Sequence, residues 1–139
     1  MTTNADITIF NKVLDPETRS DVFRPTVIRG VSIHMVLGSS SSKKNQDRLQ
    51  DARIRIPITA DTGGKKYVPS FRYKSVGGEG NIWTIQVGDL VVPHIADNIE
   101  VTRESDLWRN FDDVIVVKEY ADNTTRGSDF VKHWRIGGM

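Results

Sequence analysis

The chain has 139 residues, 37% of them hydrophobic and 27% charged, a balance too polar for a membrane protein and too apolar for a disordered one. Its 19 basic and 18 acidic residues leave a formal net charge of +1, which argues against a protein whose main task is to grip duplex DNA. The absence of cysteine excludes disulfides, thiolate metal sites and a cysteine nucleophile.

The N-terminal part of the chain predicts three short strands. Residues 1–6 have neither a basic nor an apolar segment, so we expect no secretion signal. Apolar and polar residues alternate over 7–13, which is typical of a strand with one face on a core. After a turn at 15–18, strands over 22–28 and 31–37 would give the start of a β-meander.

Residues 38–51 predict a long flexible loop. Glycine, serine, lysine and amide side chains dominate this stretch up to Arg48, and none of them is favourably buried in a core. Long loops inside a compact domain are uncommon and tend to be functional or disordered. A solvated connector is the alternative interpretation.

The middle of the chain predicts further short strands over 53–58, 83–86 and 90–92, and a strand-like segment over 99–101. Pro57 cannot donate a ladder hydrogen bond, so it predicts an edge strand or a bulge. Residues 67–76 fit either the end of a strand or one helical turn, and the pattern leaves both open.

The best helix candidate covers 102–111, with Thr102 or Ser105 as its cap. A hairpin follows, with strands over 114–120 and 130–136 joined by a polar loop over 121–129 that would project as a finger. Together these elements predict a single, mainly β domain over 1–139. We expect a small β-barrel or sandwich with one short helix and long projecting loops.

The sequence lacks the patterns of a catalytic site. His34, His94 and His133 lie far apart and have no partner at metal-ligand spacing. The glycine-rich segment 77–80 lacks the lysine and following helix of a phosphate-binding loop and fits a hairpin tip better. We therefore expect no enzymatic activity, no cofactor and no metal.

The aromatic residues instead suggest protein contacts. Trp83, Trp108 and Trp134 belong to the core by default, but an arginine follows each of the last two, and this combination suits interfaces. Together with the finger loop they give the candidate interface residues, which are Trp108, Arg109, Thr124, Thr125, Arg126 and Trp134.

Several segments resemble the small head–tail connection proteins of tailed bacteriophages. They are residues 7–12, 15–18 and 22–28, then 55–61, 83–89 and 132–138. The resemblance covers nearly the whole chain and is to an uncharacterised family encoded among phage and prophage structural genes. The shared features are turns and strands, with no shared chemistry.

Within that setting the chain looks most like a stopper, a head-completion protein. Stoppers are small β-barrels that form a ring below the portal and adaptor and retain packaged DNA. The resemblance implies that the 38–51 loop, with three basic and two acidic residues, points into the ring channel and touches DNA without gripping it. The candidate channel residues are Ser41, Ser42, Lys43, Lys44, Asn45, Gln46 and Arg48.

The implied partners are further copies of the chain in a hexameric or dodecameric ring, adaptor or portal proteins, a tail-completion protein and, passively, packaged duplex DNA. The implied location is the virion neck, assembled in the host cytoplasm, with no membrane contact. The alternatives are a tail terminator, a tail-completion protein or a capsid decoration protein. A longer helix than 102–111 would favour the terminator. A carbohydrate- or ligand-binding β module is a further alternative and requires aromatic residues along one groove.

Overall fold

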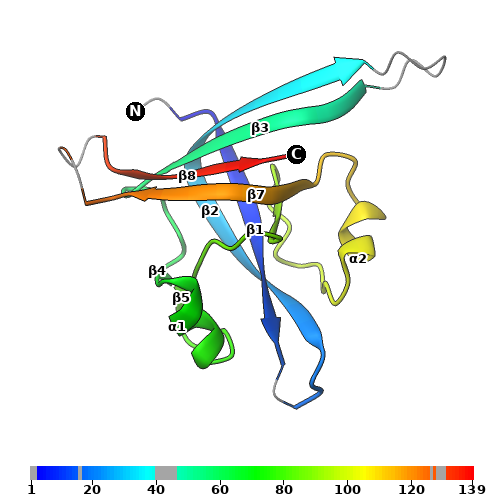
Figure 1. Cartoon of the computed structure of the whole chain (residues 1–139), viewed down its shortest axis with the longest axis vertical. Helices are drawn as coiled ribbons and strands as arrows, with labels where there is room; N and C mark the ends of the chain where they lie inside the picture. The colour runs from blue at the N-terminus through cyan, green and yellow to red at the C-terminus, as the bar shows by residue number, and fades with distance from the viewer. Residues whose placement is uncertain (1–2, 16, 40–46, 126, 128–130) are drawn as a thin grey trace.

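Alternating apolar side chains place one face of the long strands inside a closed barrel, which confirms the mainly β fold. The computed structural model describes residues 3–15, 17–39, 47–125, 127 and 131–139. The barrel strands are β1 (Ala5–Leu14), β2 (Asp21–Ser39), β3 (Asp47–Pro57), β6 (Leu90–Val92), β7 (Ile115–Asn123) and β8 (His133–Gly138). They close in the order β1–β2–β3–β8–β7–β6, and each neighbouring pair is antiparallel (Figure 1).

Besides β6, four short elements lie between β3 and β7. These are β4 (Lys66–Tyr67), α1 (Ser70–Ser75), β5 (Ile82–Trp83) and α2 (Glu104–Trp108). The strands β4 and β5 pair in parallel as a separate small sheet. None of the helices in the part of the chain that the structure describes is long and apolar enough to cross a membrane.

The barrel interior is filled by the inward residues of the long strands. Ile7 and Ile9 of β1, Ile28 of β2, Ile54 of β3 and Ile136 of β8 are fully buried. Successive strand residues point to opposite faces, so a two-residue period fills one face with apolar side chains. Closure also pairs both edges of the sheet, which protects them from unwanted strand addition.

The strand β2 is one long element, where the sequence predicted two strands over 22–28 and 31–37. Gly30 lies between them at φ +82°, and the pairing with β1 shifts register nearby, between Ala5 and Asp6. A glycine in this conformation lets a strand bend without ending it. The first half of β2 therefore pairs with β1, and its second half pairs with β3.

Both predicted loops are shorter than expected because the flanking strands continue into them. In the first hairpin, pairing of β2 with β3 extends as far as Ser39 opposite Asp47, so strand covers both ends of the predicted 38–51 loop. In the C-terminal hairpin, pairing extends to Asn123 opposite His133, so residues 121–123 are strand. Polar residues suffice here because ladder hydrogen bonds use only the backbone.

The predicted helix is also shorter than 102–111. Helix α2 covers Glu104–Trp108, and Arg103 occupies its N-cap position in place of Thr102 or Ser105. The Asp106 carboxylate accepts hydrogen bonds from the backbone amides of Thr102 and Arg103, at 3.0 and 3.1 Å, and satisfies donors at this helix start. The open segment 67–76 contains the end of β4 and the whole of α1, which adds a second short helix.

Two further segments, around the small sheet and before α2, contain fewer strand residues than predicted. Only Ile82 and Trp83 pair as β5, so residues 84–86 of the predicted strand 83–86 lie outside it. In the predicted segment 99–101, Val101 forms an isolated bridge with Phe23.

Candidate functional site

The β2–β3 hairpin extends beyond the barrel as a two-stranded ribbon. β1 pairs with β2 only as far as Val31, and β8 pairs with β3 only from Ala52 onward. From Val36 opposite Asp51 to the end, the two strands therefore have only each other as neighbours among the described strands (Figure 1). Hydrogen bonding within the ribbon holds the chain on either side of residues 40–46 away from the barrel.

The predicted channel residues belong to this ribbon and to the segment that joins its strands. Arg48 lies in β3, paired with Gly38. Ser41, Ser42, Lys43, Lys44, Asn45 and Gln46 lie outside the described residues.

The predicted interface residues fall into two separate groups. Trp108 and Arg109 are at the end of α2, where the Trp108 side chain is 46% exposed. Thr124 and Thr125 directly follow β7, whose end lies on the opposite side of Figure 1 from α2, and Arg126 lies outside the described residues. Among the described residues, the structure therefore does not bring the predicted interface candidates at α2 and after β7 into one surface.

Trp134, the remaining interface candidate, packs inward in an aromatic cluster. Its ring centroid lies 5.1 Å from that of Trp83 and 5.0 Å from that of Tyr67. Trp83 is only 1% exposed, and burial raises the pKa of Tyr67 to about 12. The three tryptophans thus do not line one open groove, which the carbohydrate-binding alternative requires.

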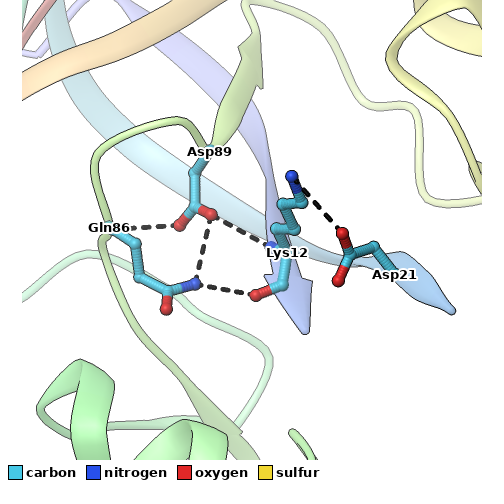
Figure 2. A network of polar contacts seen from close by, with 4 residues as sticks. All are labelled: Lys12, Asp21, Gln86 and Asp89. Carbon is cyan, nitrogen blue, oxygen red and sulfur yellow. Dashed lines mark hydrogen bonds and ion pairs between the residues drawn. The ribbon is translucent and has the colours of Figure 1, made fainter. Parts of the chain in front are cut away.

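A groove missed by the sequence analysis lies between the end of β1 and the tight turn before β6. It has a volume of about 530 Å³. Its lining residues are Lys12, Val13, Leu14, Asp21, Lys74, Gln86, Val87 and Asp89. Figure 2 shows how four of them lie, with the Lys12 ammonium 3.5 Å from the Asp21 carboxylate on the exposed side.

A buried carboxylate, Asp89, organises the floor of this groove. One of its oxygens accepts from the Lys12 amide at 3.0 Å and from Gln86 Nε2 at 3.2 Å. The other accepts from Asn11 Nδ2 at 2.7 Å and from the Gln86 amide at 3.0 Å. The network ties β1 to the 84–89 segment (Figure 2), a long-range link that explains why polar residues are buried here.

Two groups of the network are costly to bury, the Asp89 carboxylate and the Gln86 side-chain oxygen. Burial raises the pKa of Asp89 to about 6, although its four hydrogen bonds oppose the shift. Gln86 Oε1 is buried and has no hydrogen-bond partner among the described residues. In the sequence, the only signal of this network is the alternation of Thr84 and Gln86 with apolar residues.

The histidines do not form a metal site. His94 Nε2 lies 2.8 Å from Asp113, and its ring stacks on Phe111 with centroids 5.4 Å apart. His133 bonds the backbone of its own loop, through Nδ1 and the Val131 carbonyl oxygen. The described residues contain no cluster of three or more histidine and acidic side chains able to hold a metal ion.

Comparison with known proteins matches the chain to a family model. A family model described as "Family of unknown function (DUF6751)" matches residues 1–139. No curated protein and no solved structure matches the chain.

Proposed function

This chain belongs to the DUF6751 family of unknown function, and we propose that it is a structural protein of the tailed-phage virion, a stopper-type subunit of the head–tail connector. In this role a ring of subunits joins head to tail and retains the packaged DNA. The observation that carries the proposal is the β2–β3 ribbon, which extends beyond the barrel as far as Ser39 and Asp47.

The ribbon suits a channel plug for two physical reasons. Its backbone pairing extends through Ser39 and Asp47, so the two residues that flank 40–46 are held together beyond the barrel. The composition of 38–51, with a net charge of +1, favours contact with a phosphate backbone that is weak enough to be reversed. A plug that held DNA tightly would block genome ejection.

The helices favour a stopper over a tail terminator. A terminator was expected to show a longer helix than 102–111, whereas α1 and α2, the helices in the described ranges, have six and five residues. The closed barrel supports the same choice, since stoppers are the small β-barrels of the connector.

Electron microscopy tests the proposal directly. We expect the purified protein, mixed with portal–adaptor complex, to form a ring with a narrow central opening on the adaptor side. Its β2–β3 ribbons should point toward the ring axis. A protein that ignores the connector would contradict the stopper role and favour the tail and capsid-surface alternatives.

A loop replacement tests the plug itself. Ser39 and Asp47 are cross-strand partners, so residues 40–46 can be replaced by Asn-Gly, the preferred two-residue hairpin turn. We expect this variant to fold and assemble but to yield capsids that lose DNA. A second variant with seven Gly and Ser residues at 40–46 keeps the length of the loop but removes its charged and amide side chains. It therefore distinguishes an effect of loop length from an effect of these side chains. Normal DNA retention by the shortened variant would remove the plug from the mechanism.

A further inference from the structure

Helix α1 and the chain around it carry exposed apolar and basic side chains together. We define the α1 flank as residues 66–79. Only Tyr73 of α1 is buried, and Phe71 is 76% exposed. The flank has three basic residues and one acidic residue, a formal net charge of +2. Lys66, Arg72 and Lys74 are exposed and form no ion pair with any described residue.

The chain around α2 carries the opposite charge. We define the α2 flank as residues 99–113, with five acidic and two basic residues and a formal net charge of −3. Glu100, Glu104 and Asp112 are exposed and form no ion pair within the described ranges. Beside them Trp108 is half exposed, and a hollow of about 420 Å³ is lined by Ile99, Glu100, Thr102, Asp106, Arg109 and Asn110.

The two flanks lie on opposite faces of the β1–β2 hairpin. The α1 flank packs through Tyr73 on the cluster that contains Val13 and Val22. The α2 flank packs through Leu107 on the cluster that contains Phe23. Val22 and Phe23 are consecutive in β2, so their side chains point to opposite faces. Figure 1 shows α1 and α2 on either side of this hairpin.

We propose that the α1 flank of one copy of this chain binds the α2 flank of the next copy, head to tail. Each flank combines exposed aromatic surface with uncompensated charge, and the two charges are opposite, so the surfaces complement each other. Because the flanks face opposite ways, an open assembly of any length keeps one free α1 flank and one free α2 flank. Such a heterologous contact closes into a ring when its rotation allows closure. The inference deepens the proposed ring function and rests on it.

Charge reversal with a mixing step tests this contact. Variant A carries Arg72→Glu and Lys74→Glu on the α1 flank, and variant B carries Glu100→Lys and Asp112→Lys on the α2 flank. The matched control carries Arg55→Glu and Lys118→Glu, which are exposed on β3 and β7 and change the charge as much as variant A does. All four positions of A and B are exposed, so the barrel should fold unchanged.

The full-length proteins are compared by light scattering and sedimentation over increasing concentration. We expect the wild type and the control to form oligomers that weaken in high salt, and A and B alone to associate at least about tenfold more weakly. An equimolar mixture of A and B should restore assembly, because every A–B contact again joins opposite charges. Phe71→Ala should weaken wild-type assembly without changing the unfolding midpoint.

Three results would overturn the inference. They are a wild type that stays monomeric throughout, variants A and B that assemble like the control, and a folded A–B mixture that stays dissociated. The connector experiment fails separately. A protein that assembles through its flanks but does not bind the portal–adaptor complex would support this contact and contradict the stopper role. A protein that binds the complex but stays monomeric without it would support the stopper role and contradict this contact.

Discussion

Two asparagines make the same type of backbone bridge in different surroundings. Asn11 is fully buried, donates to the Thr84 carbonyl oxygen at 2.7 Å and accepts from the Thr84 amide at 3.2 Å. Asn4 is exposed and makes both kinds of bond to the backbone of Ile33, at 3.1 and 2.9 Å. Asn11 also donates to the Asp89 carboxylate at 2.7 Å, so the two residues differ in burial and in this one additional hydrogen bond.

We expect Asn11→Ala to lower the free energy of unfolding by about 2–4 kcal/mol, because the Thr84 backbone groups lose a partner where water does not replace it. Asn4→Ala should lower it by less than about 1 kcal/mol, since water can bond the freed groups. Urea denaturation measures both values. Equal losses of unfolding free energy in the two variants would contradict a special contribution from the buried network.

Asp89 predicts a pH dependence of stability. Its pKa is about 6 in the folded protein against an ordinary 3.8, so the folded state holds this proton more tightly than the unfolded chain. The contribution of the Asp89 proton to the free energy of unfolding is therefore fully present below about pH 4 and is lost as pH rises through about 6. The whole contribution is about 3 kcal/mol, the free energy that corresponds to this difference in pKa.

The measurement is the free energy of unfolding of wild type minus that of Asp89→Asn from pH 4 to 7. We expect this difference to fall across the range. Taking the difference cancels the other titrating groups. A flat difference would mean that the hydrogen bonds to the carboxylate fully offset its burial.

At the scale of elements, two adjacent glycines of β8 differ in what surrounds them. A Cβ at Gly138 would collide with the backbone carbonyl oxygen of Val116 and lie 2.8 Å from Ile115 Cγ2. The three atoms nearest to a Cβ at Gly137 all belong to the Glu119 side chain, whose Cγ and Oε1 would lie 2.8 Å away. The Glu119 side chain can move, whereas the paired backbone of β7 cannot do so easily.

We expect Gly138→Ala to destabilise the protein by about 1–3 kcal/mol through overpacking at the β7–β8 seam. Gly137→Ala should have an effect below about 1 kcal/mol. Thermal unfolding of the two variants beside wild type checks the difference. If Gly138→Ala unfolds at the wild-type midpoint, the contact between β8 and β7 is looser than described.

Across the whole barrel, β6 forms the shortest ladders with its neighbouring strands. It pairs with β1 through three residue pairs and with β7 through two, whereas β1 and β2 share ten. The side chains of Leu90, Val91 and Val92 are nevertheless fully buried. Closure at this strand therefore depends more on packing than on ladder hydrogen bonds.

We expect local opening to begin at β6, because few ladder bonds hold it. In native-state hydrogen exchange, the amides of Leu90–Val92 should exchange faster than those of Ile28 and Ile54 in the central ladders. Exchange at one common rate in all three strands would show that the barrel opens only by global unfolding.

Local sequence patterns were enough to predict the class of fold and the approximate place of the main strands. Alternation over 7–13 identified most of β1, the apolar run before Pro93 identified β6, and Leu107 with its acidic neighbours located α2. These signals are local, because a two-residue or helical period depends only on which face a residue presents.

Tertiary packing settled the choice between barrel and sandwich, joined the two halves of β2 across Gly30, and buried Asp89. It also kept the predicted interface residues apart and placed α1 and α2 on opposite faces of one hairpin. Each of these outcomes depends on pairings between residues far apart in the chain. Sequence periodicity shows which face of a strand is buried, but not which distant strand covers it.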